Sequence, residues 1–398
     1  MSATRLAFFT PVPPARTGIA TYVSNLLPLL PQEWEIELFT DGPEAGPLAD
    51  RPVHQIERWE ARHAAAPFDL NVYQVGNNAH HLSTLPFVTQ HPGLLVLHDA
   101  VLHPARAAAF LADDDIAGYR RALAGSVPQV ADSVADVVAA GLGGPSIYWS
   151  FPLCEDLLRA SRYTVVHGEM LSGWLAAQVP GANIGSVPFW LPVPECSPTK
   201  VEEWRDELGA SAEAPLLGTF GYIGAEHRVG LILETLGELA EEVPFRLVIV
   251  GTADPKLELE GAVSRGPLAD RTTLTGRVGD EDFGALLRAV DLGLNLRYPT
   301  ARAASGPLAQ LLSVGTPAVI HDLVHQRDIP WPAVLRVPTG PREEEKAMLR
   351  GVLVDWFRDE DLRARATSAA TLWGSRHVTP DALGAGFKAA VERALAVA

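Results

Sequence analysis

Short apolar runs alternate with amphipathic stretches along most of the chain. In the first half, residues 6–9, 69–75, 93–97 and 163–166 are mostly apolar runs of the length expected for strands buried on both faces of a sheet. A helical pattern over residues 19–30 follows the first run. Because alternating strands and helices form a doubly wound parallel sheet, this half predicts an α/β domain.

The second half repeats this order of strand and helix. The apolar runs that predict strands lie at residues 216–222, 245–250, 272–274, 292–296 and 317–320. Helical patterns lie at residues 230–241, 280–289 and 307–314. The predicted fold class is therefore α/β, with two doubly wound parallel-sheet (Rossmann-like) domains. Such sheets bind ligands at the carboxyl ends of their strands, so we expect a functional cleft between two facing domains.

A proline-rich segment separates the two halves. It contains Pro188, Pro192, Pro194 and Pro198 and predicts a linker at residues 191–199. We expect a first domain at residues 1–190, with a helical insertion at about 104–160, and a second domain at 200–375. The tail contains two amphipathic helical segments, and we expect the helix at 376–398 to pack back toward the first domain.

Composition narrows the classes of function. The chain has 398 residues, more than one hydrophobic core usually organises. Its net charge of −16 disfavours binding to nucleic acids and anionic membranes. Cys154 and Cys196 form neither a disulfide framework nor a zinc-binding spacing. No apolar run is long enough for a membrane span or signal peptide, so we expect a cytoplasmic protein.

Polar residues follow three of the predicted strands in the first half. His98 and Asp99 come after residues 93–97, the pair Asn77-Asn78 after 69–75, and His167 after 163–166. Since these positions lie at carboxyl strand ends, they predict a ligand site. The same residues also fit structural roles, because a buried histidine can be satisfied internally and asparagine side chains cap turns. Their spacing does not match a zinc triad, so no metal site is predicted.

Seven segments together resemble the GT-B-fold glycosyltransferases of family 4. They lie at residues 14–22, 73–78, 97–103, 165–168, 220–223, 274–277 and 294–300, in the order and spacing of that family. The resemblance implies a retaining, hexosyltransferase-type enzyme that takes a sugar from a nucleotide-diphosphate donor and needs no metal cofactor. It implies as partners a nucleotide sugar and a small-molecule or glycan acceptor.

The resemblance also implies roles in the first domain. Gly18 opens the first helix, where similar enzymes bring the backbone close to the donor phosphate and the acceptor. His98 corresponds to a histidine that contacts the transferred sugar through its backbone and ring. Asp99 would fix the tautomer of that ring or bind a substrate hydroxyl. The residues implied on the acceptor side are Asn77, Asn78 and His167.

In the second domain the resemblance implies a donor site. Arg228 would neutralise the diphosphate, and His227 stands where a lysine is common, so one permanent charge is missing. The segment Gly276-Arg277-Val278 corresponds to backbone that recognises the base. Backbone recognition leaves no side-chain code, so the identity of the base is not readable.

The segment from Arg297 onward departs most from the family pattern. The glutamate expected ahead of Ser-Gly is Ala303, or Arg302 if the register moves by one. The second acidic position is Gln310, which can still accept a hydrogen bond from a ribose hydroxyl.

Part of the expected phosphate site is nevertheless retained. Ser305 and Gly306 open a helix whose free N–H groups can hold a diphosphate. Arg297 and Arg302 are candidates for the charge that His227 does not supply, although both also fit ordinary surface positions.

Three functions are consistent with these features. The leading hypothesis is an active retaining glycosyltransferase in which the leaving phosphate assists the acceptor. The second is a glycosyltransferase-like binding or partner subunit, suggested by Ala303 and His227. The third is another enzyme on the same fold, such as a sugar-nucleotide epimerase. Over residues 104–138 aspartates offset the arginines, which favours a soluble acceptor over a lipid.

Overall fold

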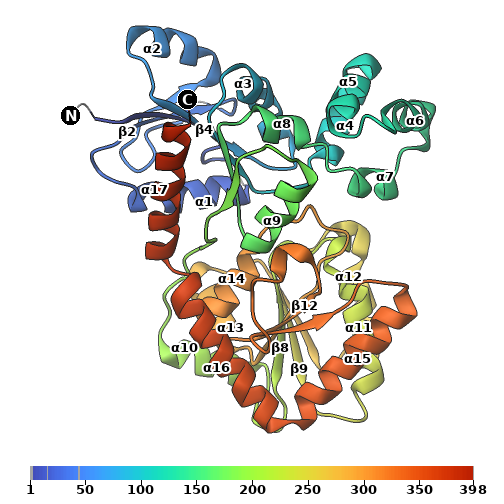
Figure 1. The fold of residues 1–398 in the computed structure, drawn as a ribbon. Helices are drawn as coiled ribbons and strands as arrows, with labels where there is room; N and C mark the ends of the chain where they lie inside the picture. Colours follow the sequence, from blue (N-terminus) through green and yellow to red (C-terminus); the bar gives the residue numbers. More distant parts are fainter. Residues whose placement is uncertain (1–2, 16, 44, 398) are drawn as a thin grey trace. The chain divides into compact units, whose positions relative to one another are not determined.

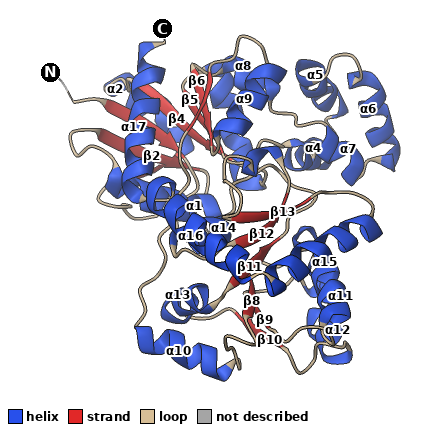
Figure 2. Ribbon diagram, turned by 60° about the horizontal axis from the view of Figure 1, so that its bottom comes forward, coloured by secondary structure: helices blue, strands red, loops and turns tan. Residues whose placement is uncertain are grey.

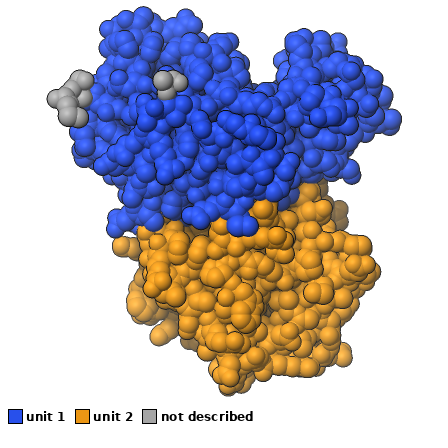
Figure 3. Space-filling model, viewed as in Figure 1, with its two compact units in different colours: residues 1–189, 300–304, 380–398 blue, residues 190–299, 305–379 orange. Residues whose placement is uncertain are grey.

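The chain forms two compact units (Figures 1 and 3). A computed structural model describes residues 3–15, 17–43 and 45–397. Unit 1 contains residues 1–189, 300–304 and 380–398, and unit 2 contains residues 190–299 and 305–379. Arg16, which belongs to one of the resemblance segments, lies outside the described residues. Within the described residues, no helix is long and apolar enough to cross a membrane.

Unit 1 is built on a parallel sheet. Its described residues form seven strands in the order β3-β2-β1-β4-β5-β6-β7, all paired in parallel. Their bounds are β1 Arg5–Phe9, β2 Glu35–Thr40, β3 Val53–Gln55, β4 Leu70–Val75, β5 Leu94–Leu97, β6 Tyr163–Val166 and β7 Ile184–Ser186. The central strands consist almost entirely of buried residues, as expected for a sheet covered on both faces.

The helices of unit 1 fall into two groups (Figure 1). The helices around the sheet are α1 Gly18–Leu26, α2 Trp59–Ala65, α3 Leu85–Gln90, α9 Glu169–Gln178 and α17 Pro380–Ala396. The predicted helical insertion contains α4 His103–Ala112, α5 Ile116–Ser126, α6 Ala131–Val137, α7 Pro145–Ser150 and α8 Glu155–Ala160. The insertion has a small core of its own, centred on Tyr119 and Leu123, which explains its alanine-rich composition.

Unit 2 repeats the architecture with a six-stranded parallel sheet in the order β10-β9-β8-β11-β12-β13 over its described residues. The strands are β8 Leu216–Phe220, β9 Arg246–Val250, β10 Thr272–Gly276, β11 Leu292–Asn295, β12 Ala318–His321 and β13 Val334–Val337. The helices are α10 Pro198–Glu207, α11 Val229–Leu239, α12 Leu259–Arg265, α13 Asp280–Ala289, α14 Gly306–Ser313, α15 Arg342–Arg358 and α16 Glu360–His377. They cover both faces of the sheet (Figure 2).

The chain returns to unit 1 at its C-terminal end. Helix α17 packs along the sheet there, with Phe387 stacked on Phe8 of β1 at a ring-centroid distance of 5.9 Å. A Cβ at Gly384 would lie 3.1 Å from the backbone oxygen of Leu29, so a small residue allows this close approach. Unit 1 thus includes a helix that follows the whole of unit 2 in the sequence.

Several strands lack the apolar pattern from which the others are predicted. In β2 the side chain of Glu37 is largely buried and is held by Arg5 and Arg62. This ion pairing lets a charged residue occupy a strand interior. The edge strands β3, β7 and β13 have only three or four residues, too few for a period to show.

Candidate functional site

The candidate residues of unit 1 gather along one edge of its sheet. Strands β1, β4, β5 and β6 are consecutive neighbours in this parallel sheet, so the loops after them share an edge. Gly18 follows β1, Asn77 follows β4, His98 follows β5 and His167 follows β6. The structure therefore brings these sequence-predicted residues to the edge where doubly wound sheets bind ligands.

A chain of hydrogen bonds joins two of these histidines. His98 Nε2 lies 2.7 Å from Gln74 Oε1, and His167 Nε2 lies 3.1 Å from His98 Nδ1. Burial lowers the pKa of His98 well below its usual value and that of His167 to about 4, so both rings are neutral at pH 7. Because Gln74 Oε1 accepts, His98 donates from Nε2 and its Nδ1 accepts from His167 Nε2, while His167 Nδ1 lies 3.4 Å from the Val187 carbonyl oxygen.

Aromatic rings enclose this pair of histidines. The ring of Tyr22 packs edge-on against His98 and His167, at centroid distances of 4.8 and 5.2 Å, and stacks on Phe189. Both ring nitrogens of His98 are thus engaged within the protein. A sugar contact at His98 would have to use its backbone carbonyl rather than a ring nitrogen.

A second polar cluster surrounds Gly76, directly after β4. A Cβ at this glycine would lie 2.9 Å from Asp99 Oδ2 and 3.3 Å from His81 Nε2. Asp99 accepts the backbone N–H of Asn77 at 2.6 Å, and burial raises its pKa to about 6. His81 Nε2 is buried and has no hydrogen-bond partner among the described residues. His81 Nδ1 donates to the Gln74 carbonyl at 2.9 Å, so Nε2 is an acceptor that the described residues leave unused.

The two asparagines after β4 have local structural roles. Asn77 Oδ1 accepts the backbone N–H of Ala105 in α4, and Asn78 Oδ1 accepts that of His80. Their side-chain oxygens are therefore occupied, and an acceptor contact through their NH2 groups stays a prediction.

At Gly18, the start of the first helix, a Cβ would have nothing within 4 Å, so the protein leaves open space beside this backbone.

The candidate donor residues of unit 2 gather at the equivalent edge of the second sheet. Strands β8, β11 and β12 are consecutive neighbours there. His227 and Arg228 follow β8, Arg297 follows β11, and His321 ends β12. A Cβ at Gly251, after β9, would lie 1.9 Å from the Gly221 carbonyl oxygen, so only glycine fits where these two loops meet.

Arg228 is held by a buried carboxylate that the sequence analysis missed. Its Nε donates to Glu345 Oε1 at 3.0 Å, and its Nη2 donates to Oε2. His321 Nδ1 accepts the backbone N–H of Arg297 at 3.0 Å, so its proton lies on Nε2, which donates to Glu345 at 2.9 Å. Burial would raise the pKa of Glu345, but the hydrogen bonds from Arg228 and His321 outweigh it and lower the pKa.

One sequence signal could have identified Glu345. In α15 it begins a stripe with Leu349, Leu353 and Trp356, all buried, at helical spacing. A carboxylate in the buried stripe of a helix requires a cationic partner. The partner itself, 117 positions earlier in the chain, has no local signal. Arg228 also has a left-handed backbone (φ 55°), which is uncommon outside glycine.

Two of the candidate residues in unit 2, His227 and Arg297, each have a side-chain nitrogen without a partner among the described residues. His227 Nδ1 lies 3.1 Å from the backbone nitrogen of Gly224 and 3.2 Å from Glu226 Oε1, so both contacts use Nδ1 and neither involves Nε2. This buried Nε2 and the buried Nε of Arg297 have no hydrogen-bond partners among the described residues. Burial lowers the pKa of Arg297, and the charge of Glu226 opposes that shift. A guanidinium with an unused donor can bind an anion.

The start of α14 is less open than the sequence suggested. Ser305 caps the helix by accepting the backbone N–H of Leu308, and its hydroxyl donates to Asn295. Because Pro307 has no N–H, Gly306 carries the free amide of this turn among the described residues. Gln310 Nε2 donates to the Pro192 carbonyl at 2.7 Å, so its oxygen remains for a ligand.

The residues just before this helix belong to unit 1. Residues 300–304, which include Arg302 and Ala303, form part of it. The Arg302 guanidinium lies 4.6 Å from the centre of the Trp174 ring, and the backbone of Ala301 accepts the N–H of Val101. Arg302 Nη1 is buried and unpaired among the described residues. Arg302 and Arg297, considered together from the sequence, thus lie in different units.

The segment expected to contact the base is exposed at the end of β10. Gly276 has a left-handed backbone (φ 62°), and its carbonyl accepts the N–H of Gly251. Arg277 is exposed, and Val278 packs against the hydrophobic core of unit 2. This geometry leaves Gly276 and Arg277 accessible at the same sheet edge as Arg297.

Solved structures identify the architecture. Sucrose-phosphate synthase from Thermosynechococcus elongatus superposes with a TM-score of 0.68 at 14% identity, over 99% of this chain and 100% of that one. The chain has a GT-B fold. HepE from Anabaena, solved in complex with UDP, superposes with a TM-score of 0.64 at 15% identity, over 98% of this chain and 99% of that chain. HepE has also been solved with UDP-glucose.

Sequence comparison gives a partial match. A 2-deoxystreptamine glucosyltransferase from Streptomyces kanamyceticus is 27% identical over 130 residues, which is 32% of this chain and 33% of that protein. The chain thus matches about a third of that relative's length. No family model matches the sequence.

Proposed function

We propose that the protein is a retaining glycosyltransferase of the family 4 type, which transfers a hexose from a nucleotide-diphosphate donor to a soluble acceptor. The observation that carries the proposal is the partly buried Arg297 in unit 2, whose Nε is buried. Its Nε lacks a partner among the described residues and follows β11 at the ligand-binding edge of the sheet. The glucosyltransferase relative and the UDP complexes of HepE support this choice of reaction and donor.

In this proposal the donor diphosphate binds at the carboxyl edge of the second sheet. Arg297 supplies a full positive charge, the N–H of Gly306 supplies a neutral donor, and His227 contributes its unpaired Nε2. Arg228 contributes less charge, because Glu345 already neutralises it. The donor site thus relies on Arg297 where similar enzymes rely on a lysine and an arginine in the loop after β8.

The reaction needs no protein base. The bond between the anomeric carbon and the diphosphate oxygen breaks, and the acceptor oxygen bonds to the same face of that carbon. The acceptor proton passes to the departing phosphate oxygen. Donors aimed at the diphosphate stabilise the negative charge that develops there. We propose that the sugar acceptor is bound by unit 1, near Gly18, His98 and the polar cluster at Gly76.

Nucleotide binding tests the proposal most directly. We expect at least one of UDP, ADP, GDP and TDP to raise the melting temperature of the protein. Arg297→Met keeps an unbranched apolar side chain but removes the guanidinium and its charge. It should weaken binding of that nucleotide by about tenfold or more, since hydrogen bonds to charged groups contribute about 1.5–3 kcal/mol.

Two comparisons give the test its controls. Arg121→Ala, at an exposed position on α5, should leave nucleotide binding unchanged. Arg297→Lys should restore part of the affinity, because it returns the charge without the planar guanidinium. Absence of binding by all four nucleotides would overturn the proposal and favour a partner subunit without transferase activity. We also propose metal-independent binding, and the same titration in a chelator tests it.

A further inference from the structure

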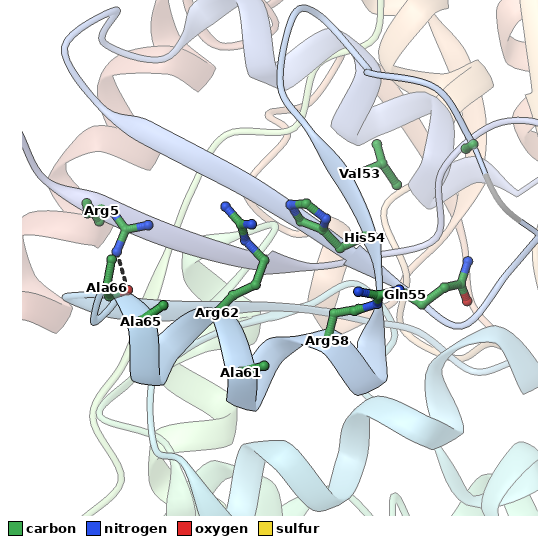
Figure 4. Close-up of a pocket in the computed structure, with 10 residues that line it drawn as sticks. Arg5, Val53, His54, Gln55, Arg58, Ala61, Arg62, Ala65 and Ala66 are labelled. Atoms are coloured by element: carbon green, nitrogen blue, oxygen red, sulfur yellow. Dashed lines mark hydrogen bonds between the residues drawn. The ribbon is translucent and has the colours of Figure 1, made fainter.

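Unit 1 contains a pocket remote from the candidate donor and acceptor residues. It lies beside β3 and α2, at the opposite end of the sheet order from β5 and β6, and has a volume of about 540 Å³ (Figure 4). Its polar lining consists of Arg5, His54, Gln55, Arg58 and Arg62. Alanines and Val53 complete the wall. A pocket of this size suits a small organic molecule.

The lining is positively charged, which is unusual in this acidic chain. Among the described residues it includes three arginines and no carboxylate, although the chain has a net charge of −16. Arg58 and Arg62 lie four residues apart, the first in the turn before α2 and the second in α2 itself. Like charges four residues apart on a helix repel each other, so this arrangement has a cost that a bound anion would offset.

Internal ion pairing accounts for only part of the positive charge. Arg5 is used fully, since it donates to Glu35, to Glu37 and to the carbonyl of Ala66. Arg62 donates to Glu37 through Nε and Nη2, which leaves its Nη1.

Arg58 is the arginine of the lining whose charge no described residue neutralises. It is exposed and forms no ion pair or hydrogen bond with any described residue. In Figure 4 its side chain extends from the start of the helix toward Gln55, on the same side of the helix as Arg62. Burial and the charges of Arg62 and Arg58 lower the pKa of His54, although Glu37 opposes this, so a neutral imidazole lines the pocket.

We propose that this pocket binds a small phosphorylated molecule, with Arg58 and Nη1 of Arg62 holding the phosphate. Two arginines on adjacent helical turns suit a tetrahedral anion with several acceptor oxygens. A phosphate alone fills a small part of 540 Å³, and the apolar wall formed by Val53, Ala61 and Ala65 leaves room for an organic body. The site is separate from the proposed donor and acceptor residues, so it can be occupied whether or not the protein transfers sugar.

The experiment measures binding by calorimetry with inorganic phosphate, glycerol phosphate and glucose phosphate as probes at millimolar concentrations. We expect at least one phosphate ester to bind more tightly than inorganic phosphate. Arg58→Ala should weaken that binding by about tenfold or more. This variant should fold normally, because Arg58 is exposed and pairs with none of the described residues.

Two further variants locate the site. Arg121→Ala removes an exposed arginine elsewhere in unit 1 and should bind the ester as the unmodified protein does. Arg297→Met removes the proposed diphosphate group in unit 2 and should also retain ester binding. Failure of all three probes to bind would overturn the proposal. So would binding that survives Arg58→Ala, or binding that Arg297→Met abolishes, which would assign the ester to the donor site.

Discussion

At the scale of single residues, Gly18 is a position where a role in ligand binding can be tested without disturbing the fold. A Cβ at this position would have nothing within 4 Å, and the helix it opens is capped by Thr17, which accepts the backbone N–H of Ala20. The protein alone therefore gives no reason for a glycine here. Open space beside a helix start is what a ligand approaching the backbone requires.

We predict that Gly18→Ala leaves the free energy of unfolding unchanged or raises it by up to about 1 kcal/mol, because alanine restricts the unfolded chain. The same change should weaken substrate binding by steric overlap. Urea denaturation and substrate titration measure the two effects. Gly173→Ala in α9 is the matched control, since its Cβ would also meet nothing within 4 Å. Unaltered binding in Gly18→Ala would show that no ligand approaches this backbone.

At the scale of elements, helix α15 supports the edge of the second sheet that carries the candidate donor residues. Its Glu345 carboxylate binds the Arg228 side chain, and through His321 it is linked to the backbone of Arg297. Two loops and one helix thus depend on one buried carboxylate. The Glu345 side chain is fully buried, while that of Arg228 is 23% exposed. Removing the Arg228 guanidinium and removing the Glu345 charge should therefore destabilise the protein by unequal amounts.

We predict that Arg228→Met destabilises the protein more than Glu345→Gln does. The first leaves a buried carboxylate without its main partner, at a cost of about 3–5 kcal/mol. The second leaves a partly exposed guanidinium that water can reach, so we expect a smaller loss. Urea denaturation of both variants and of the double variant measures their coupling. An equal or reversed order would contradict the assignment of burial to Glu345.

The sign of the pH dependence follows from the same pair. The folded-state pKa of Glu345 is lowered, so its pairing stabilises the protein above the ordinary glutamate pKa. That contribution is lost as the pH falls through the folded-state pKa. The difference in unfolding free energy between the unmodified protein and Glu345→Gln should therefore shrink as the solution is acidified.

Elements with a clear period were predictable from the sequence, and elements held by ion pairs were not. The helix α13 has the predicted bounds, and β6 does too, because apolar residues alone determine their burial. Strand β2 was missed because Glu37 interrupts its apolar run, and its partners Arg5 and Arg62 lie far away in the sequence. For the same reason the sequence indicated Arg228 but not Glu345, whose pairing requires the folded chain.

The candidate site shows the same limit. Positions after strands were predictable, since a parallel sheet gathers them at one edge. Which of these side chains keep an unused hydrogen-bonding group was not predictable. His98 has both ring nitrogens occupied, and Gln310 donates to a backbone carbonyl, whereas Arg297 retains an unused donor. Hydrogen-bond partners from distant parts of the chain decide these states, and no local pattern encodes them.

At the scale of the whole molecule, each unit is assembled from segments that are distant in the sequence. Helix α17 follows unit 2 along the chain but belongs to unit 1. Its Phe387 is fully buried and stacks on Phe8 of the central strand β1. Helix α17 is therefore part of the core of unit 1, and that core is complete only once residues 380–396 have been synthesised.

We predict that Phe387→Ala destabilises unit 1 selectively. Removing a buried phenylalanine should cost about 3–5 kcal/mol, through lost burial and the cavity left behind. Hydrogen exchange read by mass spectrometry should show faster exchange in β4, β5 and β6, which lie with α17 in unit 1, and unchanged exchange in β8 and β9. Leu395→Ala, at a 36% exposed position of the same helix, is the control and should change little. Equal acceleration in both sheets would mean that the units open together, because destabilising one core would then raise the exchange of the other.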